Sequence, residues 1–200
     1  MDILLKNKMD DAIWAAKSLF ERGKTSGSSA NLSFLYEEKI YITASGTCFG
    51  NLHYDDFAIT DFDGRQLSPK NPSKELTLHR YYYDKNPEIK AVIHTHGHYA
   101  VLWSCLEFDH NEDIIPEYTP YLRMKVGSIG LIPFAKPGTE ELFEMFKNNL
   151  NNGDAYLLKN HGGIVGGKNI YEAFYGIEEL EESSKIAWEV MNTKLKIKTI

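Results

Sequence analysis

The sequence predicts a single α/β domain over residues 1–200, built around a mixed or largely antiparallel sheet. Two observations lead to this fold class. Short apolar runs of strand length are interspersed with longer segments whose apolar residues recur at helical spacing, and the two kinds do not alternate strictly. The 200 residues also contain no internal repeat, low-complexity tract or linker, and a chain of this length buries a substantial core.

The N-terminal quarter predicts one helix and then a hairpin. From Met9 to Phe20 apolar residues recur at helical spacing, and Gly23 is a natural stop. A small polar loop, TSGSSAN, follows. The extended runs LSFLY and KIYIT come next, with Glu37 and Glu38 as the hairpin connection. The turn-forming segment ASGTCFGN then predicts a second loop.

The rest of the chain mixes helices and strands. We expect a helix between Pro72 and Pro87, because proline suits a helix start and is disfavoured in its interior. The last segment, from Tyr171 to about Lys194, predicts a long helix whose EELEE run forms a solvated face. Between them we expect strands in KAVIHTH, GLIPF, AYLLKNH and GIVGG, and helices in HYAVLWSCL and TEELFEMFKNNL.

Composition excludes several classes of function. The formal net charge is −6 and no basic tract exists, which argues against general nucleic-acid binding, although a local site can still bind an anion. No run of about 18 apolar residues predicts a membrane span, and the N-terminus has too short an apolar run for a signal peptide, so we expect a cytoplasmic protein. Cys48 and Cys105 make no disulfide framework and are expected as buried or partly buried thiols.

Three of the seven histidines fall in the stretch IHTHGHYA, at the end of an apolar run. Side chains alternate along a strand, so His94 and His96 project to one side and can offer two imidazoles to one metal ion. Zinc takes nitrogen ligands at roughly 2.0–2.1 Å and commonly uses three protein ligands in catalytic sites. Gly97 suggests that the strand ends, so His98 is expected to support the site or the structure. Taken alone, the pair could equally lie in a polar network.

Two further motifs bear on this alternative. LLKNHGGIVGG places His161 at the end of another apolar strand, before two glycines that form a tight turn or allow close approach. PSKELTLH places Glu75 in the first turn of a predicted helix. Alone, this carboxylate would be an ordinary surface acid.

Together these segments resemble the class II aldolase/adducin family. The resemblance covers nearly the whole chain and rests on TSGSSANLS, ITASG, PSKE, AVIHTHGHYA and KNHGGIVGG, in the order of the family. It implies a three-layer α/β domain with helices on both faces of the sheet, and a homotetramer with active sites between subunits. Adducin-type relatives lack the metal histidines, which this chain keeps, so the resemblance favours an enzyme.

The resemblance also implies roles for particular residues. His94, His96 and His161 would bind Zn²⁺, or another divalent metal such as Mn²⁺ or Co²⁺. Glu75 would be the acid/base and would also ligate the metal when substrate is absent. The loops that match the phosphate-binding loops of the family contain Ser28, Ser29, Asn31, Ser45, Gly46, Ser73 and Lys74. Hydroxyl groups and backbone N–H groups in such turns, near a helix N-terminus, suit an anion.

Within the family, the chain looks like the 3-oxo-tetronate 4-phosphate decarboxylase branch. Lys74 carries much of this likeness, because fuculose-phosphate aldolases tend to have serine there, and a lysine supplies a cation for a carboxylate or phosphate. Tyr121, in TPYLRMKVG, corresponds to a catalytic tyrosine that the aldolases present from a neighbouring subunit. A packed aromatic residue is the alternative for this position.

The implied reaction is zinc-dependent decarboxylation of 3-oxo-tetronate 4-phosphate to dihydroxyacetone phosphate and CO₂, through a metal-stabilised enediolate. The alternative is an aldolase of the fuculose-phosphate type, which makes the same enediolate by releasing an aldehyde. A third reading is a non-catalytic interaction domain with a structural metal, but it gives Glu75 no role.

Overall fold

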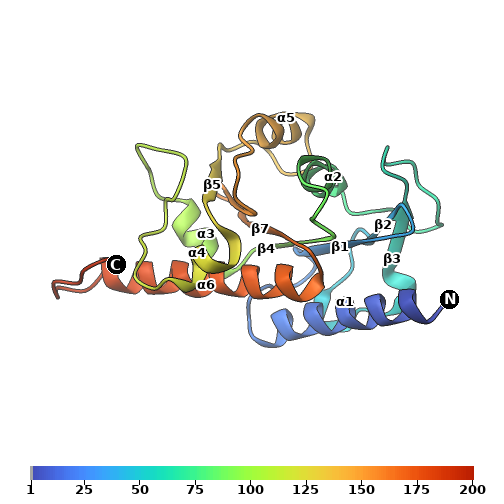
Figure 1. Ribbon diagram of the computed structural model, residues 1–200, viewed down its shortest axis with the longest axis horizontal. Helices are drawn as coiled ribbons and strands as arrows, with labels where there is room; N and C mark the ends of the chain where they lie inside the picture. Colours follow the sequence, from blue (N-terminus) through green and yellow to red (C-terminus); the bar gives the residue numbers. More distant parts are fainter. Residues whose placement is uncertain (1) are drawn as a thin grey trace.

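One seven-stranded sheet forms the centre of the computed structural model, which describes residues 2–200 (Figure 1). The strand order is β3-β2-β1-β4-β7-β6-β5, with β5 and β6 parallel and the other neighbours antiparallel. This confirms the mixed, largely antiparallel sheet. The strands are β1 (Asn31–Tyr36), β2 (Lys39–Thr43), β3 (Phe57–Thr60), β4 (Ala91–Thr95), β5 (Ile129–Ile132), β6 (Ala155–Leu158) and β7 (Gly162–Gly167).

Helices cover both faces of this sheet, as the resemblance implied. In the view of Figure 1, α2 and α5 lie above the sheet and α1 and α6 lie below it. Two apolar cores match these layers: one contains residues of α2 and α5, and the other contains residues of α1, α3, α4 and α6. The helices are α1 (Ile3–Glu21), α2 (Leu76–Lys85), α3 (His98–Ser104), α4 (Tyr121–Val126), α5 (Glu140–Asn148) and α6 (Ile170–Met191).

Alternation along β4 divides its side chains between the two cores. Val92 packs in the core under α2, whereas Ile93 packs in the core under α6. His94 has the parity of Val92 and lies directly opposite Asn31 of β1. Cross-strand neighbours in an antiparallel pair share a face, so both polar side chains lie on the α2 side, near the start of that helix.

The β1–β2 hairpin forms at the predicted position. Tyr36 pairs with Lys39, which leaves Glu37 and Glu38 as the two turn residues. Their φ angles are 46° and 57°, in the left-handed region that a two-residue type I′ turn requires at both positions. Glutamate is an unusual residue for this turn, so the apolar faces of the flanking strands fix the register.

The structure corrects several local expectations. Glu75 is the residue before α2 rather than part of its first turn, because the helix begins at Leu76. The long C-terminal helix ends at Met191. Cys105 is exposed, although Cys48 is half-buried as expected. Strand β3, helix α4 and the short 3₁₀ turns Phe49–Asn51 and Tyr54–Asp56 are additional elements that we did not predict.

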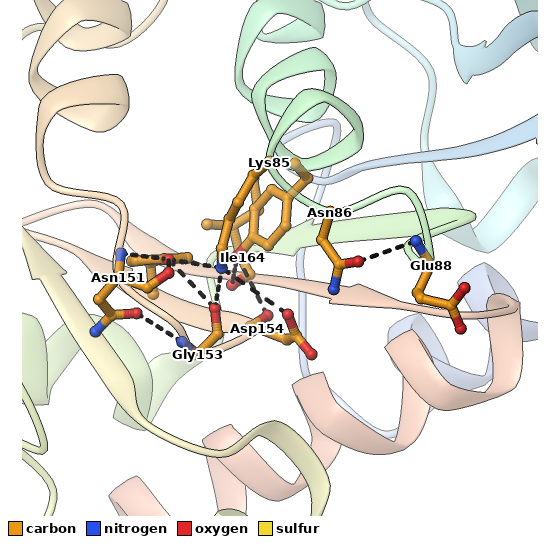
Figure 2. A network of polar contacts seen from close by, with 9 residues as sticks. Lys85, Asn86, Glu88, Asn151, Gly153, Asp154 and Ile164 are labelled. Atoms are coloured by element: carbon orange, nitrogen blue, oxygen red, sulfur yellow. Dashed lines mark hydrogen bonds and ion pairs between the residues drawn. The ribbon is translucent and has the colours of Figure 1, made fainter.

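The C-terminal end of α2 is tied to the loop before β6 by a polar network (Figure 2). The Lys85 ammonium donates to the carbonyl oxygen of Gly153 and to the hydroxyl of Tyr156, the latter at 3.0 Å. This contact holds one end of the helix against the sheet while Glu75 precedes its other end.

Among residues 2–200, no helix has the length and apolarity needed to cross a bilayer.

Candidate active site

Three imidazoles from two separate segments meet on the α2 side of the sheet. The ring centroids of His94, His96 and His161 lie 4.7–4.9 Å apart. One nitrogen from each ring lies within 4.8 Å of the other two. The Nε2 atoms of His94 and His96 are 3.0 Å apart. Two nitrogens bound tetrahedrally to zinc lie about 3.3 Å apart, so this spacing suits a shared metal ion.

The local fold accounts for this meeting. His94 belongs to β4 and His96 follows it directly, while His161 lies in the turn between β6 and β7. Strand β7 pairs with β4, so this turn ends beside the end of β4. At position 162 a Cβ atom would stand 2.4 Å from the carbonyl oxygen of Thr95, which explains the need for glycine after His161.

The histidines are held in the neutral form that metal binding needs. Burial, together with the neighbouring imidazoles, lowers the pKa of His94 and of His161 to about 3 in each case. Burial also lowers the pKa of His96. His94 Nδ1 donates to the carbonyl oxygen of Gly163 at 2.9 Å, so its Nε2 keeps a free lone pair toward the other rings.

Glu75 completes this donor set. Its Oε2 lies 3.4 Å from His94 Nε2, and its Oε1 lies 3.4 Å from His161 Nε2. The carboxylate is buried together with these two rings. Three neutral imidazoles and one carboxylate form a donor set that suits a divalent metal such as zinc. The arrangement therefore fits a divalent metal ion.

A cavity of about 330 Å³ opens beside Glu75. All seven residues predicted in the phosphate-binding loops line it. The loop after α1, the start of β1, the loop after β2 and the segment before α2 supply these residues, so hydroxyl groups and Lys74 surround the space. Four lining residues were not anticipated: Ala30, Ala44, Pro137 and Gly138.

The Asn31 side chain is engaged within the protein. Its Nδ2 donates to Glu75 Oε2 at 2.9 Å, and its Oδ1 lies 2.5 Å from His79 Nε2. Asn31 lines the cavity and also connects Glu75 to a buried histidine of α2. His79 had no expected role, and its only sequence signal is a histidine on the apolar, sheet-facing side of the helix.

Tyr121 is not brought to the cavity by its own chain. It is the first residue of α4, and 59% of its surface is exposed. It does not line the cavity beside Glu75. The structure therefore does not place this tyrosine beside Glu75.

A buried carboxylate behind the histidines corrects the expectation of a solvated EELEE face. Glu181 is 3% exposed and accepts the backbone N–H groups of Tyr99 and Ala100 at 3.0 and 2.8 Å. These N–H groups belong to the first turn of α3, which begins two residues after His96. A Cβ atom at position 97 would stand 2.5 Å from Glu181 Oε2, so Gly97 gives this carboxylate its space.

Known proteins resemble this chain over most of its length. The sequence profile of the class II aldolase and adducin N-terminal domain matches residues 10–188. The chain belongs to this family. A 3-oxo-tetronate 4-phosphate decarboxylase of Haemophilus influenzae is 37% identical over 185 residues, which cover 92% of this chain and 88% of the relative. An L-fuculose phosphate aldolase of Methanococcus vannielii is 32% identical, covering 87% of this chain and 92% of the relative.

Solved structures of this family share the fold. The crystal structure of YgbL from Escherichia coli superposes with a TM-score of 0.89 at 32% identity, covering 95% of this chain and 92% of that one. An L-fuculose 1-phosphate aldolase gives a TM-score of 0.86 at 27% identity, covering 97% and 90%.

Proposed function

We propose that this protein is a metal-dependent decarboxylase that converts 3-oxo-tetronate 4-phosphate to dihydroxyacetone phosphate and CO₂. Its decarboxylase and aldolase relatives support a metal-dependent lyase. The observation that carries the finer proposal is Lys74, which lines the cavity beside Glu75 in a chain 37% identical to a decarboxylase of that name. A lysine there suits a substrate that bears both a carboxylate and a phosphate.

The substrate is a β-keto acid, so its decarboxylation leaves an electron pair next to a ketone. The bond between the carboxylate carbon and C2 breaks, its electron pair stays on C2, and CO₂ departs. Addition of one proton to C2 then gives dihydroxyacetone phosphate. A divalent cation held by His94, His96 and His161 would supply a Lewis acid that stabilises the negative charge.

The chain's own residues bind the substrate and move the proton. The hydroxyl-lined loops and Lys74 bind the anionic groups and fix the substrate across the cavity. Glu75 stands between this cavity and the imidazoles, and delivers the proton to C2 from its protonated form. We also propose that the protein is cytoplasmic. We propose that it forms a homotetramer in which Tyr121 reaches the active site of a neighbouring subunit.

The test supplies the purified protein with 3-oxo-tetronate 4-phosphate and follows both products. We expect CO₂ and dihydroxyacetone phosphate in equal amounts with Zn²⁺, Mn²⁺ or Co²⁺, and none after chelation. A folded, metal-loaded protein that releases no CO₂ with any of these ions would refute the assignment.

An aldolase is the second candidate, because the fuculose-phosphate aldolase fold superposes over 97% of this chain. Retro-aldol cleavage leaves its electron pair on the same kind of carbon, so the histidines and Glu75 would serve it equally. Incubation with fuculose 1-phosphate separates the two, since an aldolase releases an aldehyde and no CO₂.

A further inference from the structure

A chain of buried hydrogen bonds runs from Glu75 into the layer between α2 and the sheet. Asn31 bridges Glu75 and His79, through contacts of 2.9 and 2.5 Å. His79 Nδ1 lies 2.7 Å from Ser33 Oγ, which lies 2.6 Å from the Tyr83 hydroxyl. All four residues beyond Glu75 are at most 5% exposed. Such a chain is costly to bury unless each of its members finds a partner.

Two regular elements build this chain. Asn31 and Ser33 are two positions apart on β1, so they share the face of the sheet that α2 covers. His79 and Tyr83 are four residues apart and lie in one row along α2, and Glu75, four residues before His79, caps the helix at the start of that row. The two rows interleave, and each polar side chain meets one from the other element.

The donors in this chain have one consistent direction. Oε2 of Glu75 accepts from the Asn31 amide, so the Asn31 carbonyl oxygen must accept from His79 Nε2–H. A neutral His79 then accepts at Nδ1 from the Ser33 hydroxyl, which in turn accepts from Tyr83. Burial favours this neutral form, since it lowers the pKa of His79 to about 3.

We propose that Asn31, His79, Ser33 and Tyr83 form a one-directional hydrogen-bond chain that orients Glu75, with His79 as its central positioning residue. The chain holds Oε2 through the Asn31 amide and leaves Oε1 on the His161 side, outside the chain. This rests on the proposed function in so far as Glu75 moves a proton. The chain is not a proton relay, because a neutral amide at Asn31 interrupts it.

The chain fixes Asn31 as well as Glu75. If His79 loses its acceptor interaction with Ser33, its proton can move to Nδ1, and Asn31 must rotate to donate to Nε2. The Asn31 carbonyl oxygen would then face Glu75 Oε2, and two acceptors repel each other. Loss of the hydrogen bond between His79 and Ser33 therefore displaces the Glu75 carboxylate, although neither residue touches it.

The first test reads the proton position on His79 and is independent of any substrate. Zinc-loaded protein labelled with ¹⁵N-histidine is studied by long-range ¹H–¹⁵N correlation, and the His79 signals are assigned by their loss in His79→Gln. We expect a neutral ring protonated at Nε2. A ring protonated at Nδ1, or at both nitrogens, would overturn the proposed direction even if the protein proves to be a decarboxylase.

The second test compares matched variants with the substrate on which the wild type is active. Ser33→Ala should lower kcat about 10- to 100-fold, with KM changed less than about threefold, because a slight misplacement of a catalytic group slows the chemical step. Ser184→Ala is the control: its equally buried hydroxyl donates to the Leu180 carbonyl at 2.7 Å, remote from this chain. It should leave kcat unchanged.

Rescue distinguishes positioning from packing. His79→Gln keeps an N–H donor within reach of Asn31, whereas His79→Phe keeps only the bulk. We expect Gln to retain at least about fivefold more kcat than Phe at similar melting temperatures. Equal kcat values for these two variants would show that the hydrogen-bond chain does not position Glu75. Equal losses of kcat in Ser33→Ala and Ser184→Ala would show the same. A wild type that releases no CO₂ would refute only the proposed substrate.

Discussion

Single residues of this site owe their chemistry to burial. His94, His79 and His161 are buried, and desolvation lowers the pKa of each to about 3, well below its usual range. A metal ligand must be a neutral imidazole, so burial suits His94 and His161 to the proposed metal site. The same cause keeps His79 neutral, as the proposed orientation of Glu75 requires.

Acid stability should report these buried rings. In the folded protein the pKa of His79 is about 3, against about 6.5 when unfolded, so between these values the unfolded chain binds more protons. Stability is therefore lost as pH falls below about 6.5, at roughly 1.4 kcal/mol per pH unit for each such histidine. His79→Gln should flatten this slope by about one histidine's share, as measured by urea unfolding of metal-free protein from pH 7 to 4. An unchanged slope would contradict a neutral His79, and His110→Gln, at an exposed position, is the control.

Substitution of Lys74 should affect substrate binding more than the chemical step. In Lys74→Met the cavity loses the cation that we propose binds the substrate, while Glu75 and the histidines remain. We expect KM to rise roughly 10- to 100-fold, the equivalent of one charge-assisted hydrogen bond, with kcat less affected. Lys70→Met is the control, since Lys70 is exposed and lies 3.4 Å from Asp56. Steady-state kinetics with equal effects of the two variants would remove Lys74 from substrate binding.

At the scale of elements, periodicity predicted the direction of the side chains of one strand, but not which residues of other elements contact them. Alternation along β4 placed His94 and His96 on one side without any structure. His79 and Glu181 escaped notice because each is a polar residue on a helix whose partner comes from a distant segment. Glu181 sits within an acidic run that reads as solvated, and only the packing of α6 against α3 shows that one of its carboxylates is buried.

Glu181 should contribute to the stability of α3. Its carboxylate accepts hydrogen bonds from two of the N–H groups that a helix start leaves free. Its negative charge also interacts favourably with the positive end of the helix dipole. Glu181→Gln should lower the free energy of unfolding by about 1–3 kcal/mol, measured by urea denaturation. Glu182→Gln, in a half-exposed ion pair with Lys24, should cost about 0–1 kcal/mol. If the two variants are equally stable, the buried cap has no special weight.

Lys85 should matter for the other helical layer (Figure 2). Its side chain is 15% exposed, and partial burial lowers its pKa while its ammonium donates to Gly153 and Tyr156. Lys85→Met leaves those acceptors without their donor, so we expect a loss of about 1–3 kcal/mol in thermal or urea unfolding. Lys168→Met removes only an exposed pair with Glu88 and should cost about 0–1 kcal/mol. A loss no larger than that of Lys168→Met would mean that water replaces the network.

The whole molecule divides the predicted catalytic residues between two places. The sheet and α2 gather Glu75 with the histidines on one side, while Tyr121 opens α4, a helix of the opposite layer, and is exposed. No sequence pattern could reveal this separation, because it depends on which face of the sheet each helix covers. A site shared between two subunits would bring the two residues together, as we propose.

Mixed oligomers provide the test of such a shared site. Glu75→Gln and Tyr121→Phe subunits should each be nearly inactive alone, and each should still bind zinc through the three histidines. If Tyr121 acts on a neighbour, subunits dissociated together and reassembled at equal ratio should regain about one quarter of wild-type activity, because that share of sites joins two intact residues. Reassembly of each variant alone is the control, and sedimentation checks that oligomers form. If the activity stays at the level of the separate variants, Tyr121 either acts within its own chain or takes no part in the reaction. Full activity of Tyr121→Phe alone would show that it takes no part.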